Sequence, residues 1–459
     1  MMQQLSVVIL AAGKGKRMVS DSPKVLHQIG GKPLLGHVLH TASCLDAAKR
    51  LVVYGHGGEA VKAAFASETD IVWVEQAQQL GTGHAIAQAL PAIDPSDVVL
   101  VLYGDVPLIR AETLQPLVAD ARAGRLALLT VELSNPSGYG RIVRDERGRV
   151  LRIVEHKEAT PIERNLREIN TGILAVSADK LRGWVSELDN DNSQGEYYLT
   201  DIIELAVRDG VPVEAFTVTE PAEVQGINDR QQLAELERFY QARQTEKLLI
   251  DGVTLLDPAR VDIRGTISTG KDVVIDVNVI FEGNVRLGNR VQIGPFCLLR
   301  DAVIGDDVEI QSHCWIDSAE VGNGAHIGPF ARLRPESRLA PGVHIGNFVE
   351  TKKATIGPGS KVNHLTYIGD AEIGASVNIG AGTITCNYDG ANKHKTVIGD
   401  GAFIGSNSSL VAPVQIGQGA TVGAGSAVSG AVPDHGLCLT RAPRKDVASW
   451  ERPTKPAKN

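Results

Sequence analysis

The chain has 459 residues, of which 43% are hydrophobic and 22% charged, and its formal net charge is −8. This length predicts two or three domains with cores of their own, and the composition excludes a largely disordered chain. The negative charge argues against broad nucleic-acid binding, so any phosphate site has to come from a local group of Lys and Arg side chains.

Cysteine use and hydropathy indicate where the protein works. The five cysteines are odd in number, widely scattered and form no C-x-x-C pair, which disfavours a disulfide framework and a cysteine zinc site. The N-terminus lacks the basic flank and cleavage site of a signal peptide, and apolar runs such as residues 98–103 are too short to span a bilayer. We therefore expect a cytoplasmic protein with neither membrane nor nucleic acid as a partner.

The first half of the chain alternates short apolar runs with helical stretches. The runs are nearly continuous in Val, Leu and Ile, as in strands that helices cover on both faces, and they span residues 6–11, 51–54, 71–74, 98–103 and 126–131. Residues 141–156 differ, because two alternating segments flank Asp145-Glu146-Arg147-Gly148, a hairpin signal. This half is predicted to be a Rossmann-like α/β domain with a mostly parallel sheet and an added antiparallel piece.

A helical period follows this domain. Leucine and aromatic residues recur every three or four positions from residue 229 to 251, and Asp229 can cap the start. We expect a first domain at 1–228, a connecting helix at 229–251, a second domain at 252–442 and a partly ordered tail at 443–459.

The second domain shows a six-residue repeat. An aliphatic residue followed by glycine recurs, often six residues apart, as at Leu287-Gly288 and Ile293-Gly294 and again at Ile373-Gly374 and Ile379-Gly380. This period is typical of a left-handed parallel β-helix built from hexapeptide repeats, with the aliphatic side chain inside and the glycine expected to permit a tight corner turn. The phase breaks between Ile379 and Ile398, where residues 382–390 are expected to project as a polar functional loop.

A glycine-rich segment follows the first predicted strand. Residues 10–18, with Pro23-Lys24 shortly after, let backbone N–H groups approach phosphate closely. Its positive charge comes from Lys14, Lys16, Arg17 and Lys24. The segment is neither G-x-G-x-x-G nor a G-K-[ST] loop, and a plain strand-to-helix turn is the alternative. The basic residues favour phosphate binding at the ligand edge of an α/β sheet.

Tyr103-Gly104-Asp105 ends another apolar strand. A carboxylate at this edge suits Mg²⁺, which takes few protein ligands and shares the phosphates of the substrate. A helix cap or turn aspartate is the alternative.

His364 lies between coils of the predicted β-helix and could accept a proton near neutral pH. A solvent-facing histidine is the alternative, although no other group in the polar insertions is expected to titrate near pH 7. Four cations could gather round an anionic substrate or form a solvated face, namely Arg334, Lys352, Lys353 and Lys393.

These motifs together resemble a known family. Residues 10–17 with Pro23-Lys24 are similar to the signature of sugar-1-phosphate nucleotidyltransferases. Further motifs lie at residues 76–84, 103–105, 138–141, 155–157, 168–172 and 195–198, and in the second half at 332–334, 346–350, 364–367 and 380–390. Nearly the whole chain therefore resembles the bacterial bifunctional N-acetylglucosamine-1-phosphate uridyltransferases and glucosamine-1-phosphate N-acetyltransferases.

The resemblance implies two activities. The second domain would acetylate glucosamine 1-phosphate from acetyl-CoA, and the first would then couple N-acetylglucosamine 1-phosphate to UTP, releasing pyrophosphate. The product, UDP-N-acetylglucosamine, feeds peptidoglycan and lipopolysaccharide synthesis. The family implies a homotrimer held by the β-helices, with acetyltransferase sites between subunits.

The resemblance also assigns site residues to the first domain. Asp105 and Asn228 would hold Mg²⁺, and Arg17 would act on the phosphates as a catalytic residue. The nucleotide and the sugar would be bound by Leu10, Ala11, Ala12, Gly13, Lys24, Gln76, Gly81, Thr82, Tyr103, Gly104, Gly140, Glu155 and Asn170.

In the second domain the resemblance makes His364 the catalytic base that takes a proton from the sugar amine. The sugar phosphate would be held by Arg334, Lys352, Tyr367, Asn378 and Lys393. Acetyl-CoA would be surrounded by Asn387, Tyr388, Ser406, Ala424 and Arg441.

Two other interpretations compete. The chain could be a single nucleotidyltransferase with a regulatory or assembly β-helix, as in the similar ADP-glucose pyrophosphorylases, but a scaffold needs neither His364 nor the Asn387-Tyr388 loop. A pure interaction solenoid would leave the basic glycine loop and Asp105 unexplained.

Overall fold

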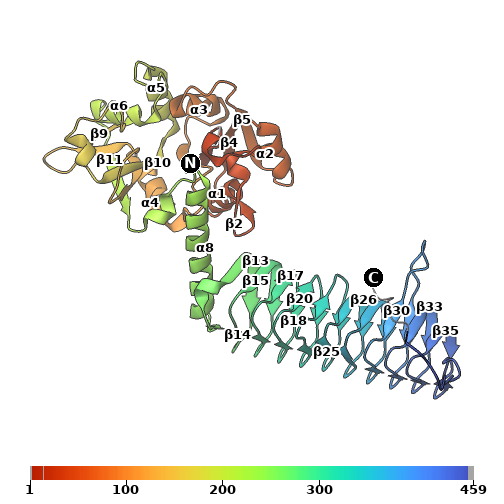
Figure 1. The fold of residues 1–459 in the computed structure, drawn as a ribbon. Helices are drawn as coiled ribbons and strands as arrows, with labels where there is room; N and C mark the ends of the chain where they lie inside the picture. The colour runs from red at the N-terminus through yellow and green to blue at the C-terminus, as the bar shows by residue number, and fades with distance from the viewer. Residues whose placement is uncertain (1–2, 14, 453–459) are drawn as a thin grey trace, which may run out of the picture. The chain divides into compact units, whose positions relative to one another are not determined.

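A computed structural model describes residues 3–13 and 15–452. Lys14, which the sequence analysis counted among the phosphate-binding cations, and tail residues 453–459 lie outside the described residues. The chain forms two compact units, Met1–Ala242 and Arg243–Asn459 (Figure 1). Each unit has a separate hydrophobic core.

The first unit is built on one sheet with the strand order β11-β7-β10-β6-β1-β4-β5. Its strands are β1 (Leu5–Leu10), β4 (Lys49–Tyr54), β5 (Ile71–Glu75), β6 (Val98–Tyr103), β7 (Leu126–Glu132), β10 (Glu168–Ser177) and β11 (Val213–Val218). The five apolar runs are thus confirmed as strands. All neighbours pair in parallel except β10, which is antiparallel to both β6 and β7 and which the sequence analysis did not predict.

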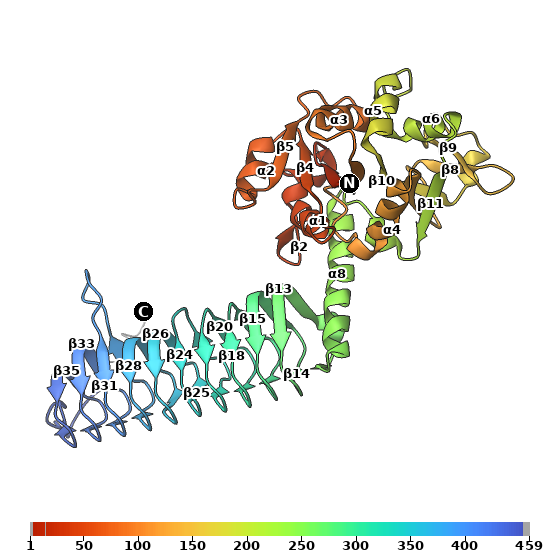
Figure 2. The same ribbon diagram turned by 180° about the vertical axis from the view of Figure 1, so that it is seen from behind.

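Helices cover both faces of this sheet (Figures 1 and 2). One apolar layer contains residues of α1 (Leu34–Ser43), α2 (Gly58–Ala64) and α4 (Ala111–Arg122), and the other contains residues of α3 (Thr82–Ala89), α5 (Ala178–Glu187) and α6 (Ile202–Arg208). The alternation along a strand explains the continuous apolar runs: Val7 and Ile9 join the first layer, whereas Val8 and Leu10 join the second.

The predicted hairpin is also present. Strands β8 (Arg141–Arg144) and β9 (Val150–Val154) pair antiparallel, and β8 also joins β10. The Asp145 carboxylate accepts the backbone N–H groups of Arg147 and Arg149 at 2.9 Å each, which closes the turn.

Helix α8 spans Arg230–Ile250, where the helical period predicted a helix, and Asp229 accepts the backbone N–H of Gln232 at 2.9 Å as its cap. The division into two units falls inside α8, after Ala242. The boundaries 228 and 252 stay a prediction. Among the described residues, no helix combines the length and the apolar composition that a membrane crossing requires.

The second unit consists of two parallel sheets wound as a β-helix (Figure 2). The first sheet contains β12 (Thr254–Leu255), β14 (Val274–Ile275), β16 (Gln292–Ile293), β19 (Glu309–Ile310), β22 (His326–Ile327), β25 (His344–Asn347), β27 (Lys361–His364), β29 (Asn378–Ile379), β32 (Phe403–Ile404), β34 (Thr421–Val422) and β36 (Leu437–Cys438). Their inward aliphatic residues, such as Ile345 at 1% exposed, form one continuous core.

The second sheet covers the other faces of the prism. It contains β13 (Val261–Thr269), β15 (Val279–Leu287), β17 (Leu298–Arg300), β18 (Val303–Ile304), β20 (Trp315–Asp317), β21 (Glu320–Val321), β23 (Arg332–Leu333), β24 (Arg338–Leu339), β26 (Glu350–Ile356), β28 (Tyr367–Ile373), β30 (Ile384–Cys386), β31 (Thr396–Ile398), β33 (Ser409–Ile416) and β35 (Ala427–Val432). Long strands bend across an edge: β26 pairs with β23 at one end and β24 at the other.

The explanation expected for the repeat glycines is wrong. Gly322, like most glycines that follow the inward aliphatic residue, does not have a positive φ. It is required because a Cβ atom there would lie 2.7 Å from the backbone of Ala340 in the next coil. The left-handed turn falls two residues later, and other residues as well as glycine occupy it, as at Arg290 (φ 56°) and Phe296 (φ 61°).

The polar loop begins later in the chain than expected. Residues 384–386, which the sequence analysis placed in the loop, form β30 and continue the coil. The insertion comprises residues 387–395, which the pairing of Tyr388 with Lys393 closes, and it projects from the prism near β30 and β33 (Figure 1).

Candidate active sites

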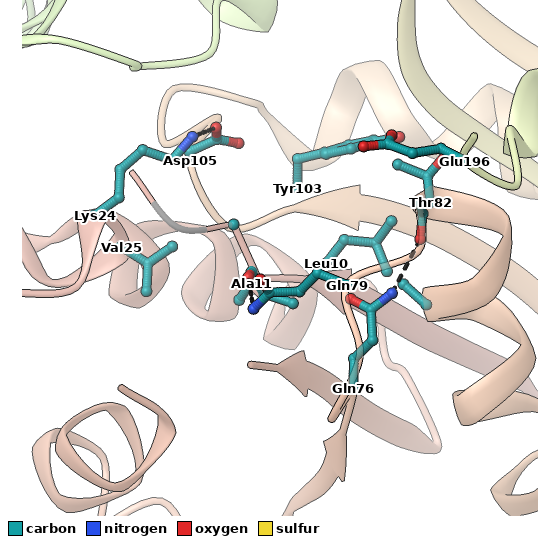
Figure 3. A pocket seen from close by; sticks show the side chains of 14 residues that line it. Leu10, Ala11, Lys24, Val25, Gln76, Gln79, Thr82, Tyr103, Asp105 and Glu196 are labelled. Carbon is teal, nitrogen blue, oxygen red and sulfur yellow. Dashed lines mark hydrogen bonds and ion pairs between the residues drawn. The ribbon is translucent and has the colours of Figure 1, made fainter. Parts of the chain in front are cut away.

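A cavity of about 440 Å³ lies at the carboxyl ends of β1 and β6 (Figure 3). Ten residues predicted to bind nucleotide or sugar line it: Leu10, Ala11, Ala12, Gly13, Lys24, Gln76, Gly81, Thr82, Tyr103 and Asp105. The sequence analysis missed four further lining residues, Val25, Gln79, Ala85 and Glu196. Gln79 and Glu196 lie within the motif ranges 76–84 and 195–198, but nothing in their spacing indicated that they face this cavity.

Amide side chains fix the backbone on one side of the cavity. Gln76, which is 3% exposed, donates from Nε2 to the Gly81 carbonyl and to His84 Nδ1, both at 3.0 Å. Gln79 donates to the Ala12 carbonyl at 3.0 Å. Gly81 has φ 106°, and a Cβ atom there would lie 2.6 Å from the Tyr197 carbonyl oxygen, so only glycine fits. The loop after β1 and the start of α3 are thereby held in fixed positions.

The two predicted metal ligands converge on one cation. The Lys24 ammonium contacts Asp105 Oδ2 and donates to Asn228 Oδ1 at 3.2 Å (Figure 3 shows the first contact). The Ile227 N–H also donates to the Asp105 carbonyl at 3.0 Å, which joins the two segments. Within the described residues no cluster of three or more His, Cys, Asp or Glu side chains could hold a metal. A carboxylate and an amide oxygen that already face one cation fit Mg²⁺, because it takes few protein ligands.

Arg17 is exposed on the short helix η1 (Lys16–Met18) and does not line the cavity. No hydrogen bond or ion pair of its side chain is found among the described residues. It lies near Tyr139, whose pKa is raised by burial and by Asp105 but lowered by Arg17. Tyr139 therefore lies within electrostatic reach of both the Arg17 guanidinium and the Asp105 carboxylate.

The three predicted sugar-binding residues meet beside the cavity. The Asn170 N–H donates to the Gly140 carbonyl at 2.9 Å, and a Cβ atom on Gly140 would lie 3.3 Å from Glu155 Oε1. The Thr200 hydroxyl donates to Glu155 at 3.2 Å. Burial raises the pKa of Glu155. This corner can therefore supply hydrogen bonds to a polar ligand.

Nearby side chains share this partly buried environment. Burial, together with Asp105 and Glu155, raises the pKa of Tyr103. Burial and then Glu155 raise the pKa of Asp201 to about 6. Gly104 follows Tyr103, and its N–H donates to the Leu10 carbonyl at 2.9 Å, which ties the ends of β1 and β6 together.

In the second unit, His364 ends β27 at one corner of the prism and is exposed. Backbone hydrogen bonds stack the same corner of successive coils: Leu365 N–H to Asn347, Gly382 N–H to His364, Asn407 N–H to Ala381 and Gly425 N–H to Ser406. His364, Ser406 and Ala424 therefore stand on one edge. A Cβ atom on Gly425 would lie 3.9 Å from Arg441 Cδ, which places Arg441 at its end.

Three cations gather on the adjoining face. The Lys393 ammonium, with help from Arg334, lowers the pKa of Lys352, while Asp370 opposes this. Arg334 donates to Glu350 at 2.7 Å. Positive charges gathered in this way favour the binding of an anion.

Tyr367 belongs to this group. A Cβ atom on Gly369 would collide with the Tyr367 hydroxyl oxygen, and Lys352 is in register with Gly369 on the neighbouring strand. Asn378 does not join it, because it stands in the other sheet, in register with Lys361.

The inserted loop carries the remaining predicted residues. Asn387 is 8% exposed and donates to the Asp370 carboxylate, whereas Tyr388 is 60% exposed. The loop also holds His394, whose Nε2 lies 2.7 Å from Asp389 Oδ2. His364 is therefore not the only histidine in the polar insertions, contrary to the expectation.

Three family models match the chain. A MobA-like NTP transferase domain matches residues 7–168, a GMPPB C-terminal domain matches residues 263–363, and the bacterial transferase hexapeptide (six repeats) matches residues 395–430. With the parallel coils, the hexapeptide match confirms the predicted left-handed β-helix.

Curated relatives match nearly the whole chain. A protein named "Bifunctional protein GlmU" from Alkalilimnicola ehrlichii is 57% identical over 99% of this chain and 97% of its own length. Proteins of the same name from Marinobacter nauticus and Acinetobacter baumannii are 56% and 55% identical, over 99% and 98% of this chain and 100% and 99% of theirs.

Proposed function

The chain belongs to the family of bifunctional GlmU proteins, and we propose that the cavity of the first unit is its uridyltransferase site and the His364 edge of the second its acetyltransferase site. The enzyme makes UDP-N-acetylglucosamine for cell-wall synthesis: it acetylates glucosamine 1-phosphate and transfers a uridyl group to N-acetylglucosamine 1-phosphate. The β-helix is therefore a catalytic domain rather than a regulatory scaffold.

The observation that supports the uridyltransferase site best is the convergence of Asp105 and Asn228 on the Lys24 ammonium. These two residues would hold Mg²⁺, which would offset the charge of the triphosphate. Lys24 and the exposed Arg17 would face the phosphates, and the backbone at residues 10–13 would bind the nucleotide. The sugar phosphate oxygen attacks the α-phosphorus and pyrophosphate leaves, so the side chains act by positioning and charge neutralisation.

Gly140, Glu155 and Asn170 support a sugar site beside this cavity. The buried Glu155 carboxylate can accept hydroxyl groups of the ring, and the Thr200 hydroxyl holds its orientation. A hydrogen-bonding corner of this kind discriminates by leaving buried polar groups unpaired when the wrong sugar binds.

At the second site, His364 would take the proton from the amine as it attacks the thioester carbonyl of acetyl-CoA, and the CoA thiolate leaves. The mutual repulsion of Lys352 and Lys393 supports a sugar-phosphate site there. Acetyl-CoA would lie along the edge of Ser406 and Ala424 and against the loop that carries Tyr388.

We propose a homotrimer through the β-helix. Side chains at the left-handed position of this corner form a stacked aromatic ladder of Phe296, His313, Phe330 and Phe348, with ring centroids 4.7–5.2 Å apart. The three phenylalanines are 44–57% exposed, and Leu365, next to His364, continues the row at 64%. An apolar row on a surface marks an interaction site. We expect further copies of this chain to cover the row, because the row leads to the proposed catalytic edge. Asn378, which was predicted to hold the sugar phosphate, lies on a different sheet from Lys352 and Tyr367 of the same chain.

The cytoplasm is the proposed location. All five cysteines, each among the described residues, are free thiols, which agrees with a reducing compartment.

Incubation of the enzyme with glucosamine 1-phosphate, acetyl-CoA, UTP and Mg²⁺ should give UDP-N-acetylglucosamine, CoA and pyrophosphate. Chelation of the metal should stop nucleotide formation and leave CoA release unchanged. If chelation stopped both reactions equally, the assignment of Mg²⁺ to the first unit alone would be wrong. Phe330→Asp should yield a monomer on sedimentation and lose acetyl transfer only, whereas a trimer with normal activity would contradict the ladder as the interface.

A further inference from the structure

One carboxylate of the first unit is buried against an arginine whose side chain is half exposed. Glu223, in α7 (Pro221–Val224), is 1% exposed. Its Oε1 accepts the backbone N–H of Arg110 at 3.2 Å, and its Oε2 accepts Nε at 3.1 Å and Nη2 at 2.5 Å from the same residue. The pair is thus held by three hydrogen bonds that use both the main chain and the guanidinium of one arginine.

The two partners belong to the two segments that carry the proposed metal ligands. Arg110 ends the connection from β6 to α4, in which Asp105 lies five residues earlier. Glu223 lies in the last turn of α7, and Asn228 lies five residues later, in the connection from α7 to α8. Leu108, Ala222 and Ile227 of the same segments share one small apolar cluster.

The Arg110–Glu223 pair and a backbone hydrogen bond join the segments carrying Asp105 and Asn228. At one end the Ile227 N–H donates to the Asp105 carbonyl at 3.0 Å, and at the other end Glu223 binds Arg110. Two connections that are fixed at both ends cannot slide past each other without breaking one of these contacts. The separation of the Asp105 and Asn228 oxygens is therefore coupled to the ion pair, although neither of its members lines the cavity.

Stability alone explains the pair poorly. Burying a carboxylate costs desolvation energy, and an apolar pair of similar volume is often at least as stable. The Arg110 side chain is 50% exposed, but the contact still fixes relative position, because its three hydrogen bonds are satisfied together in one geometry only. The geometry points to Arg110 and Glu223 as positioning residues that pre-set the Asp105–Asn228 metal site of the uridyltransferase; this rests on the metal site proposed above.

Metal binding tests the inference on the full-length chain. Mn²⁺ would be titrated in the presence of UDP-N-acetylglucosamine, with free Mn²⁺ followed by electron paramagnetic resonance. Glu223→Gln, which keeps an acceptor for the Arg110 N–H but removes the charge, should weaken Mn²⁺ binding about 10-fold, as loss of a supporting group around a metal site does. Arg110→Ala should do the same, and Arg110→Lys should restore part of the affinity.

Activity gives a second measurement. Uridyl transfer by Glu223→Gln should need about 10-fold more Mg²⁺ for its half-maximal rate and should approach the normal rate at saturating metal. Acetyl transfer by the same preparation should be unchanged, which shows that the chain is folded. Leu181→Ala, in the opposite apolar layer on α5, is the matched control for general destabilisation and should leave the Mg²⁺ requirement unchanged.

Two results would separate the possible failures. If Asp105→Ala abolished Mn²⁺ binding while Glu223→Gln and Arg110→Ala bound it normally, the positioning role would be wrong and the metal site would stand. If Asp105→Ala bound Mn²⁺ normally, the metal site itself would be misplaced. Equal weakening in Leu181→Ala would also overturn the positioning role, because destabilisation alone would then explain the effect.

Discussion

The two units present their functional side chains in different ways. In the first, distant segments meet in a cavity, and their charges already neutralise one another: Lys24 and Asn228 are 204 residues apart and share a hydrogen bond. In the second, side chains stand on the outside of a regular prism, and Lys352 and Lys393 repel each other. The first site is therefore assembled within one chain, whereas the second displays neighbouring positive charges that a bound anion would help to balance.

This difference follows from the two architectures. An α/β sheet collects the ends of parallel strands at one edge, so residues far apart in sequence converge there. A β-helix repeats one coil, as Leu298 pairs with Trp315, 17 residues later, so its outward residues form rows along the prism. A row of side chains can contact a ligand along its length but encloses it little. This agrees with a long substrate such as acetyl-CoA.

The largest expected effect tests the exposed row. His364→Ala should lower acetyl transfer by about 10²–10⁴-fold, because the amine must lose a proton and a histidine base contributes about that much. His364→Asn should behave alike, since an amide cannot act as a base at this pH. Uridyl transfer by the same protein is the control. Near-normal acetyl transfer at pH 7 would remove His364 as the base and direct attention to His394.

A somewhat smaller effect tests the enclosed site. Asp105→Asn should reduce uridyl transfer by about 10²–10³-fold, the usual loss when one electrostatic group is removed from an active site. Acetyl transfer should remain unchanged, because Asp105 belongs to the first unit, whose core is separate. Rates of both reactions on one preparation provide the measurement. Equal loss of the two activities in a folded protein would mean that the units depend on each other.

The sequence predicted the second unit more fully than the first because its information is periodic. The aliphatic-glycine phase located the coils, and it showed that something interrupts them after Ile379, although the loop proved to begin only at residue 387. The rows of outward side chains were not predictable from the sequence. Two side chains share an edge only if they occupy the same position relative to the corners of their coils, and the sequence does not show where each corner falls. His394 was overlooked because its place in the insertion became clear only once β30 was seen to continue the coil.

In the first unit the strands were predictable and the convergence was not. Continuous apolar runs identified five strands, but β10 mixes polar and apolar residues, with Asn170 and Thr171 in its first half, and its antiparallel pairing left no periodic signal. The contacts of Lys24 with Asp105 and Asn228 join three separate segments. Spacing along the chain carries no information on such a contact. The family resemblance paired Asp105 with Asn228 at the metal, but it placed Lys24 at the phosphates of the nucleotide.

The repeat glycines offer a test of what makes the prism regular. Gly322→Ala should destabilise the β-helix by about 1–3 kcal/mol, because its Cβ would collide with the next coil at 2.7 Å. Gly324→Asn, two residues later on the same corner, is the matched control: it has φ 64° and nothing within 4 Å, and asparagine tolerates that conformation. Thermal unfolding of both variants is the measurement. Equal destabilisation would show that conformation, rather than close approach, determines where glycine is needed.

The smallest expected effect concerns Asp201, a partly buried carboxylate of the first unit. Burial and the neighbouring Glu155 raise its pKa to about 6, whereas an unfolded aspartate titrates near 3.9. Between these pH values the folded state holds a proton that the unfolded state has lost, so stability falls as pH rises from about 4 to 6 and stays reduced above pH 6.

Asp201→Asn removes this penalty and should raise the stability of the first unit at pH 8 by about 1–2 kcal/mol, since solvent screens the half-buried carboxylate and Glu155 shares part of the shift. The gain should shrink as the pH falls through 6 and vanish below about 4. Calorimetry at pH 4, 6 and 8 measures it, with Asp179→Asn, an exposed carboxylate on α5, as the control. If the gain in stability did not change with pH, Asp201 would be destabilising for a reason other than its charge. The enclosed site of the first unit would then differ less from the open site of the second than its electrostatics indicate.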